Sequence, residues 1–513
     1  MESSSNDALP KTPTPETDAV INDPYQHEQE GYRPHLKTRQ IRMIAIAGAI
    51  GSGLFLGAGG RLASAGPSLF IAYAVAGLLV YFMMRALGEL VVHRPSSGSF
   101  ISYAREFYGE KFAFVAGWMN FLFWATVAII DVTAVATYAH FWSFFTSVPQ
   151  WLLALIALIG ILAVNLISVK LFGELEFWFA FIKVAAIIAF LIIGTIVLAF
   201  GWPLQHDGAT SQPSLFMWAD NGGILPGGLL ALVFVFQGVI FAYGGTELIG
   251  TAAGETAEPR KVIPKAVSSV MWRIGIFYIA TVILLSLLLP NTAYSASESP
   301  FVTFFASLGG QRTGEIAGSV MNLVVITAAL SAMNAGLYST GRSLRSMALN
   351  GAAPKFAARM GRNGVPYMGI LVTAAVALLG VGLNYVVPEN AFEIALNMST
   401  LGILSTWATI VLCQIALRRK VTAGEAPMPS YRMPGAPVTS YLALAGFAVT
   451  FVLIAIDYPT GTFTVATFVA LGIPALIIGW YAARTRIARL AAERRGLTGA
   501  IPATRDRTPE DTR

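Results

Sequence analysis

The sequence predicts an all-α integral membrane protein with twelve transmembrane helices, on three observations. Of its 513 residues, 55% are hydrophobic and only 12% are charged, whereas soluble proteins carry about 25% charged residues. The apolar residues fall into runs of about 20 or more, the length that crosses a bilayer as a helix. The lysines and arginines gather in alternate connections between these runs, which is the pattern of loops on the cytoplasmic side of a membrane.

Twelve apolar runs are long enough to span a bilayer. They cover residues 41–65, 67–90, 112–140, 151–170, 175–201, 229–254, 266–289, 315–341, 366–386, 392–416, 438–456 and 463–483. Residues 1–35 are polar and acid-rich, and are expected to form a disordered cytoplasmic tail. Residues 36–483 form the expected membrane domain, and residues 484–513 a basic cytoplasmic tail.

The positive charges set the expected orientation. With the N-terminus in the cytoplasm, all but three of the 34 lysines and arginines lie on or near the inner face. Arg61 and Arg312 fall outside, and Lys183 lies within a span. The net charge of +6 therefore reflects topology and gives no indication of a nucleic-acid partner, although a basic inner face suits anionic lipid headgroups.

The connection at residues 93–111 is long for a link between spans. It mixes Gly, Ser, aromatic and charged residues. This composition favours a structured segment at the membrane surface over a plain linker.

The first span contains a glycine break, Gly48-Ala49-Ile50-Gly51-Ser52-Gly53-Leu54-Phe55, and the sixth contains another, Phe241-Ala242-Tyr243-Gly244-Gly245-Thr246-Glu247. Non-helical backbone at membrane depth is tolerated where it is buried in protein or lines a cavity. Two such breaks, one in each half of the chain, indicate a transporter's substrate site. Close packing of glycines between helices is the alternative explanation for either break alone.

A broken helix offers both charges that an amino acid needs. The half-helix that restarts after a break exposes N–H groups and a positive dipole end, which suit a carboxylate. The half-helix that ends there exposes carbonyl groups, which suit an ammonium group. The substrate-binding residues expected from the breaks are Ile50, Gly51, Ser52, Gly53, Phe241, Ala242, Tyr243 and Gly244. A nucleotide-binding fingerprint is excluded, because the glycine spacing is wrong and no strand precedes it.

The run from Arg39 to Phe55, the stretch His93–Lys111, Gly250–Glu255 and Ser299–Phe305 carry a resemblance to a known family. The chain resembles the amino acid–polyamine–organocation superfamily over about residues 30–485. Within it, the chain is similar to the bacterial amino acid permeases, and among these to the branch that carries L-asparagine. Ser52 stands where many relatives carry Thr, and both residues keep a hydroxyl group.

The resemblance implies a five-plus-five inverted repeat, with broken helices 1 and 6 and two peripheral helices. It also implies uptake of an amino acid with a proton by alternating access, in the inner plasma membrane with both termini cytoplasmic. In proton-coupled relatives, the lysine that matches Lys183 stands where a sodium ion binds elsewhere in the fold. A permease for another amino acid, an exchanger, or a membrane nutrient sensor of the same fold are the alternatives.

Ionisable residues within spans are costly and usually functional. Lys183 in the fifth span is expected to couple transport to the proton, because burial eases loss of its proton; a fixed cation paired with a carboxylate is the alternative. Asp131 in the third span is expected to line the substrate pocket, carry a proton or be a structural acid. Glu247 directly follows the second break, where it would brace the freed N–H groups or relay a proton.

Residues of the sixth, eighth and tenth spans complete the expected site. Ser331 and Asn334 share a face of the eighth span and are expected near Lys183, with polar contact between helices as the alternative. Phe241 is expected to form a lid over the substrate or simply to pack. In the tenth span, Asn397, Ser399 and Thr400 are weaker candidates for contact with the substrate's side chain.

The sequence indicates neither an enzyme nor a cofactor. It contains no Walker motif that would indicate ATP as the driver, and no cluster of Cys and His that would hold a metal. Its single cysteine, Cys413, lies in an apolar run, where packing is its expected role. The expected partners are a small amino acid, a proton and the bilayer, with oligomeric state left open.

Overall fold

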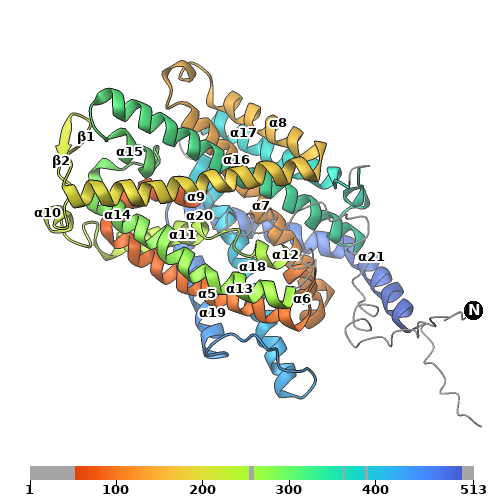
Figure 1. The fold of residues 1–513 in the computed structure, drawn as a ribbon. Helices are drawn as coiled ribbons and strands as arrows, with labels where there is room; N and C mark the ends of the chain where they lie inside the picture. Colours follow the sequence, from red (N-terminus) through yellow and green to blue (C-terminus); the bar gives the residue numbers. More distant parts are fainter. Residues whose placement is uncertain (1–51, 97, 253–258, 362–363, 388–390, 500–513) are drawn as a thin grey trace, which may run out of the picture.

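The computed structural model describes residues 52–96, 98–252, 259–361, 364–387 and 391–499. Nearly all of these residues lie in helices that form one bundle (Figure 1). Within the described residues, nine helical stretches are long and apolar enough to cross a membrane, and two shorter apolar helices accompany them. The protein is therefore a predominantly helical, multi-pass membrane protein.

The described part of the first half of the bundle contains nine α-helices and a two-stranded hairpin before the second break. They are α3 (Ser52–Phe55), α4 (Ala58–Ala65), α5 (Leu69–His93), α6 (Ser99–Tyr108), α7 (Glu110–Ala139), α8 (Gln150–Ile167), α9 (Val169–Phe200), β1 (Leu204–His206), β2 (Ala209–Ser211), α10 (Met217–Asp220) and α11 (Gly228–Ala242), with 3-10 turns at Gly66–Ser68 and Ser143–Phe145.

The second half continues from the end of that break. Its helices are α12 (Leu248–Ala252), α13 (Pro259–Arg273), α14 (Thr281–Leu288), α15 (Pro300–Ala306), α16 (Gln311–Leu349), α17 (Tyr367–Val386), α18 (Ala391–Thr422), α19 (Val438–Ile456), α20 (Thr460–Thr467) and α21 (Ile473–Gly499), with π-helical segments η5 (Ile274–Ala280) and η8 (Phe468–Gly472) and 3-10 turns at Asn291–Ala293 and Lys355–Ala358.

Each predicted span from residue 67 onward coincides with a helix or a broken helix. The part of the first predicted span that precedes Ser52 lies outside the described residues, so the count of twelve crossings stays a prediction. Several helices are longer than the apolar run that predicts them; α16, for example, has 39 residues. The excess lies at polar ends, where a helix can continue beyond the hydrocarbon.

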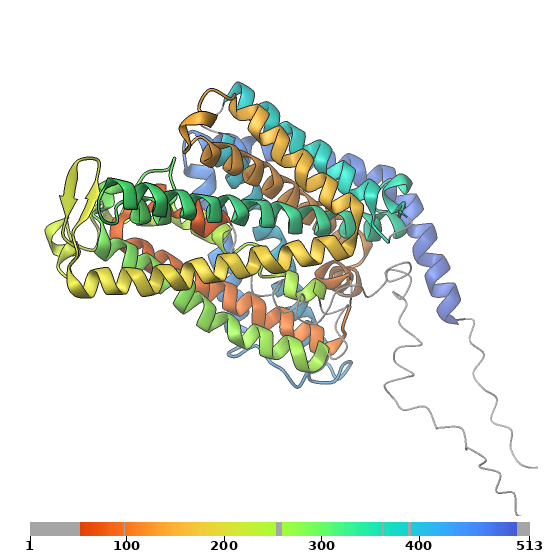
Figure 2. The ribbon, with the colours of Figure 1, turned by 45° about the horizontal axis from the view of Figure 1, so that its top comes forward.

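The all-α prediction missed one small β-hairpin. Strands β1 and β2 are antiparallel, with Leu204 opposite Ser211 and His206 opposite Ala209. Three-residue strands carry too little alternation to be recognised from sequence. The hairpin lies at one end of the bundle, and α6 lies at the opposite end (Figures 1 and 2).

The connection at 93–111 is structured, as predicted. It forms α6, whose N-terminal half is buried. The Tyr103 hydroxyl donates to the carbonyl of Arg94 at 2.6 Å. Glu106 binds both His93, at 3.2 Å, and Arg94, at 2.8 Å. These contacts fix α6 against the end of α5.

A second buried carboxylate closes the same end of the bundle. Glu89 on α5 is fully buried and accepts hydrogen bonds from Arg418 of α18 and from the backbone N–H of Met433, the latter at 2.9 Å. Gln414 donates to the same carboxylate at 3.3 Å. The ends of α5 and α18 and the loop before α19 are thereby joined.

The Glu106 contacts predict a pH-dependent stability. Burial raises the pKa of Glu106, but the His93 bond and the Arg94 charge outweigh it, so that the pKa lies below its ordinary value of 4.5. A carboxyl with a lowered pKa stabilises the fold above its unfolded-state pKa, and the effect is lost as the pH falls through the folded-state pKa. Glu106→Gln should therefore lower stability at pH 7 by about 1 kcal/mol, and the difference from wild type should shrink below about pH 4.5.

Melting temperatures of the detergent-purified protein between pH 7 and pH 4 test this. Glu425→Gln, at an exposed carboxylate in the loop after α18, is the control. If the difference in melting temperature between wild type and Glu106→Gln stays constant over this range, the charge of Glu106 contributes nothing to stability through His93 and Arg94.

Candidate functional site

The second break is present where the sequence predicts it. Helix α11 ends at Ala242 and α12 begins at Leu248. The turn between them is closed by hydrogen bonds from the N–H of Tyr243 to Ile240 and from the N–H of Gly244 to Phe241, at 3.1 and 2.8 Å. Gly245 follows with a φ of +93°, a backbone conformation that favours glycine over residues with a side chain.

The first break is described only in part. Ile50 and Gly51 lie outside the described residues, as does the side chain of Ser52. Helix α3 begins at Ser52 and ends after four residues, and α4 restarts at Ala58. The chain that follows the predicted break is therefore two short helices rather than one, and Ser52 and Gly53 occupy the first turn.

The two breaks meet at Gly53. A Cβ atom placed on Gly53 would overlap the Cα of Ala242 and lie 2.9 Å from its Cβ. Only glycine permits this approach of the backbones. Residues 189 positions apart in the chain are thus in contact, and both belong to the predicted substrate-binding set.

Three tyrosines pack behind the second break. Tyr243 is fully buried, and its hydroxyl donates to the carbonyl of Tyr73 at 2.8 Å. Tyr278, from the π-helical segment η5, donates to the carbonyl of Ala242 at 3.0 Å. The Tyr243 side chain is therefore bonded to α5. The π-helical turn places Tyr278 where it satisfies a carbonyl freed by the break.

Glu247 is bonded within the break and to α18. Its carboxylate accepts the N–H of Gly245 at 3.1 Å and the indole N–H of Trp407 at 3.2 Å. Trp407 is fully buried. These bonds are those expected of a brace for the interrupted backbone. Trp407 was not among the predicted site residues, and nothing local in the sequence indicates its contact with residue 247.

Lys183 lies in a buried cluster of charged groups. Lys183 and Glu176 on α9 are each 2% exposed, and Asp131 on α7 is 0% exposed. Among the described residues, Glu176 and Asp131 are carboxylates near enough to Lys183 for their charges to favour its protonated form. The three groups have a formal net charge of −1 when all are ionised.

Ser331 and Asn334 join this cluster through Glu176. The Ser331 hydroxyl donates to one Glu176 oxygen at 2.7 Å, and the Asn334 amide donates to the other at 3.2 Å. Asn165 on α8 donates in turn to Asn334 at 2.8 Å. The predicted pair therefore lies in the Lys183 region, and the network connects α7, α8, α9 and α16.

In this network, Glu176 and Asn165 are residues that the predicted site did not include. Glu176 stands seven residues before Lys183, on the same helix face, which is a signal that sequence reasoning can use. Asn165 is a lone amide in the apolar fourth span, and its partner is 169 residues away. Only the packing of α8 on α16 reveals it.

The remaining predicted residues are placed as follows. Phe241 is buried in the main core. Asn397 on α18 is 1% exposed, and its side-chain oxygen accepts no hydrogen bond from the residues that the structure describes. Ser399 and Thr400 donate to backbone carbonyls of Phe123 and Leu396. Asn397 is thus the member of this group with an acceptor still available.

Comparison with known proteins agrees with this architecture. Residues 40–490 match the family model described as amino acid permease. The chain is 57% identical to L-asparagine permease 1 of Mycobacterium tuberculosis (strain ATCC 25618 / H37Rv), over 93% of this chain and 96% of the relative. It is 55% identical to the L-asparagine permease of Streptomyces coelicolor over 91% and 93% of the two chains. Identity to the L-asparagine permease of Escherichia coli (strain K12) is 54%, over 90% and 91%.

The match covers the breaks, the charged network and all of the long apolar helices. A family of permeases indicates a membrane transporter of amino acids rather than an enzyme. The chain belongs to the amino acid permease family.

Proposed function

We propose that this chain imports L-asparagine together with a proton, by alternating access to a site between its two breaks. The contact of Gly53 with Ala242 carries this proposal, because it brings the half-helix ends together where a zwitterion's two charges would bind. The names of the similar permeases support asparagine as the cargo. The proposed topology is twelve spans in a five-plus-five inverted repeat, in the plasma membrane, with both tails cytoplasmic.

The backbone would hold the part common to all amino acids. The N–H groups of the first turn of α3, at Ser52 and Gly53, would receive the carboxylate. Carbonyls of residues 241–244 would receive the ammonium group. The carbonyl of Ala242 already accepts one bond from Tyr278, but a carbonyl oxygen has two lone pairs and retains capacity for a second.

Asn397 would recognise the side chain. Its buried oxygen has no hydrogen-bond donor among the described residues, and a buried polar atom without a partner costs about 1–3 kcal/mol. The side-chain amide of asparagine supplies the missing N–H donor. A carboxylate side chain would place oxygen against oxygen instead, which favours asparagine over aspartate.

The charged cluster would carry the proton. Lys183, Glu176 and Asp131 have a formal charge of −1 when all are ionised, and loss of the Lys183 proton would make this charge −2. A larger uncompensated charge is strongly disfavoured in a low-dielectric interior. We assign the exchanged proton to Lys183, whose two carboxylate neighbours hold the charged form in place until the inner side opens.

The first prediction concerns the cargo. Proteoliposomes should accumulate labelled L-asparagine when an inward proton gradient is imposed, and should lose this accumulation when the gradient is collapsed. Excess 3-aminopropanamide, which lacks the α-carboxylate, and succinamic acid, which lacks the amine, should each compete weakly, because the breaks bind both charges together. A panel of unlabelled L-amino acids measures selectivity, and strong inhibition by the simple amine would contradict recognition of both charges.

The second prediction concerns the contact of the breaks. Gly53→Val should weaken asparagine binding by about fivefold or more, since the added atoms overlap Ala242 and overpacking costs about 1–3 kcal/mol. Gly160→Val is the matched control, because a Cβ at Gly160 on α8 meets no atom within 4 Å. Binding is measured by titration on protein that elutes as wild type; unchanged affinity in Gly53→Val would place the carboxylate elsewhere.

The third prediction concerns coupling. Lys183→Ala should abolish uphill accumulation of asparagine against its gradient while retaining exchange of labelled for unlabelled asparagine. Lys183→Arg should not restore accumulation, because a guanidinium group does not release its proton. Lys265→Ala, in the exposed part of α13 outside the core, serves as the control for removing a lysine.

Two results of this experiment would contradict the assignment. Normal proton-driven accumulation by Lys183→Ala would remove Lys183 from the coupling mechanism. Restoration by Lys183→Arg would leave residue 183 as a fixed cation and move the proton to Asp131 or Glu176.

A further inference from the structure

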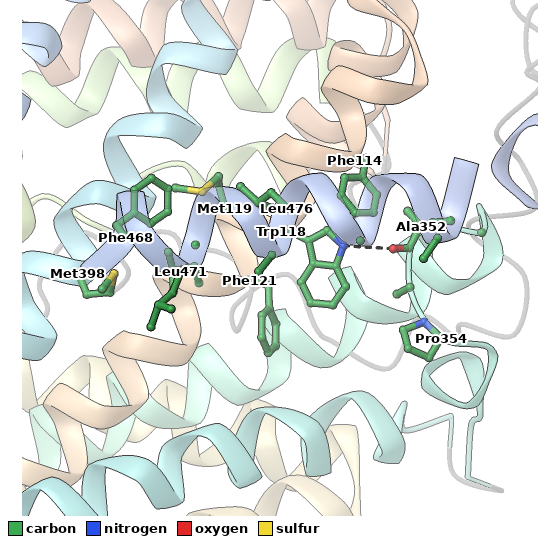
Figure 3. A pocket seen from close by; sticks show the side chains of 18 of the residues that line it. Phe114, Trp118, Met119, Phe121, Ala352, Pro354, Met398, Phe468, Leu471 and Leu476 are labelled. Atoms are coloured by element: carbon green, nitrogen blue, oxygen red, sulfur yellow. Dashed lines mark hydrogen bonds between the residues drawn. The ribbon is translucent and has the colours of Figure 1, made fainter. Parts of the chain in front are cut away.

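A cavity of about 680 Å³ lies away from the breaks and from the Lys183 cluster. It opens between α7 and the final helical span, η8 and α21, and the loop 351–354 closes one end (Figure 3). Its volume is within the range of about 300–1,000 Å³ that ligand pockets occupy. None of the residues of the candidate substrate site lines it.

The wall of this cavity is apolar along its length. Phe114, Trp118 and Phe121 of α7 face it together with Leu471 and Leu476 of the final span (Figure 3). The indole N–H of Trp118 donates to the carbonyl of Ala352 at 3.1 Å. The indole nitrogen of Trp118 therefore has a hydrogen-bond partner, and the apolar surface of the ring is free to contact a bound molecule.

A second cavity, of about 730 Å³, lies against the same final span. It shares Met119, Phe468 and Leu476 with the first. Phe468 begins the π-helical segment η8, a kind of irregularity that is frequent at functional sites. The final span thus stands between two apolar spaces.

The end of the first cavity at the loop 351–354 carries positive charge. Arg486 donates to the carbonyls of Ala353 and Ala348, at 2.9 and 2.8 Å. Both acceptors are neutral, so these bonds hold the guanidinium in position without cancelling its charge. Arg484 and Arg489 lie on the same end of α21, and Lys111 lines the second cavity.

An apolar cavity with a guanidinium group at one end matches the chemistry of an anionic phospholipid, which has an apolar chain and a negatively charged headgroup. A second copy of the chain fits less well: a transmembrane helix about 30 Å long and 10 Å wide occupies roughly 2,400 Å³, far more than 680 Å³. We propose that this cavity holds an acyl chain of a phospholipid whose anionic headgroup binds Arg486. The site would fasten the final span to α7 through a lipid rather than through direct packing.

Fluorescence quenching by brominated lipids tests this, because bromine quenches tryptophan only at contact. The full-length protein is placed in nanodiscs that contain a small fraction of dibrominated phosphatidylglycerol or, in parallel, dibrominated phosphatidylcholine. The signal of Trp118 is isolated as the difference between wild type and Trp118→Phe. We expect about fivefold stronger quenching of Trp118 by the anionic lipid at equal mole fraction.

Matched variants separate the headgroup from the chain. Arg486→Gln should abolish the preference for phosphatidylglycerol, and Arg489→Gln, at a residue 64% exposed on the same helix, should preserve it. Ala475→Phe, which fills the cavity, should reduce quenching by both lipids. Ile478→Phe, at a residue 69% exposed that does not line the cavity, should not.

Three results would overturn the proposal. Equal quenching of Trp118 by the two lipids would exclude headgroup recognition. Unchanged quenching in Ala475→Phe would exclude a chain in the cavity, and this variant leaves Arg486 intact if Arg486→Gln fails to fold. Absence of quenching together with a dimeric mass by mass photometry would show that a second copy covers this face.

Discussion

The constraint on which this structure depends is that hydrocarbon offers no partner to a polar group, so each buried charge must be satisfied by the protein itself. Lys183 is surrounded by Glu176 and Asp131, and Glu176 in turn accepts bonds from Ser331 and Asn334. Because these groups come from three helices, α7, α9 and α16, their arrangement can hold only while the helices stay in register. A change in the protonation of such a cluster changes how strongly the helices are held together, and a chemical event at one residue can thereby become a movement of whole spans.

The same constraint explains the second break. Interrupting a helix frees backbone groups, and the structure satisfies them one by one: Glu247 accepts the N–H of Gly245, and Tyr278 donates to the carbonyl of Ala242. Trp407 completes the arrangement by bonding Glu247 from α18. The break is therefore a supported feature rather than a weak point. Gly53 can approach it closely because residue 53 has no side chain, and a Cβ there would overlap the Cα of Ala242.

The helices and many of the buried polar residues could be predicted from the sequence. The partners of these polar residues could not, because they come from distant parts of the chain. Hydrophobic runs locate nearly every helix, and the polar residues within them, Asp131, Lys183, Ser331 and Asn334, are conspicuous because their neighbours are apolar. The residues that bind them are not conspicuous in the sequence. Ser331 finds Glu176 across 155 positions and Trp407 finds Glu247 across 160, and such pairs depend on how helices pack, which no local pattern records. Gly53 was predicted to approach a ligand, and the contact with Ala242 adds a backbone neighbour that the spacing of glycines did not reveal.

Proton linkage in substrate binding tests the central claim, that the charged cluster and the site between the breaks act as one unit. L-asparagine would be titrated calorimetrically into the purified protein in buffers that differ in ionisation enthalpy. The dependence of the observed heat on the buffer gives the number of protons taken up for each asparagine bound. Wild type should take up part of a proton on binding, and Lys183→Ala should bind asparagine without proton uptake. Binding by wild type with no exchange of protons, over the pH range in which transport follows the gradient, would contradict it.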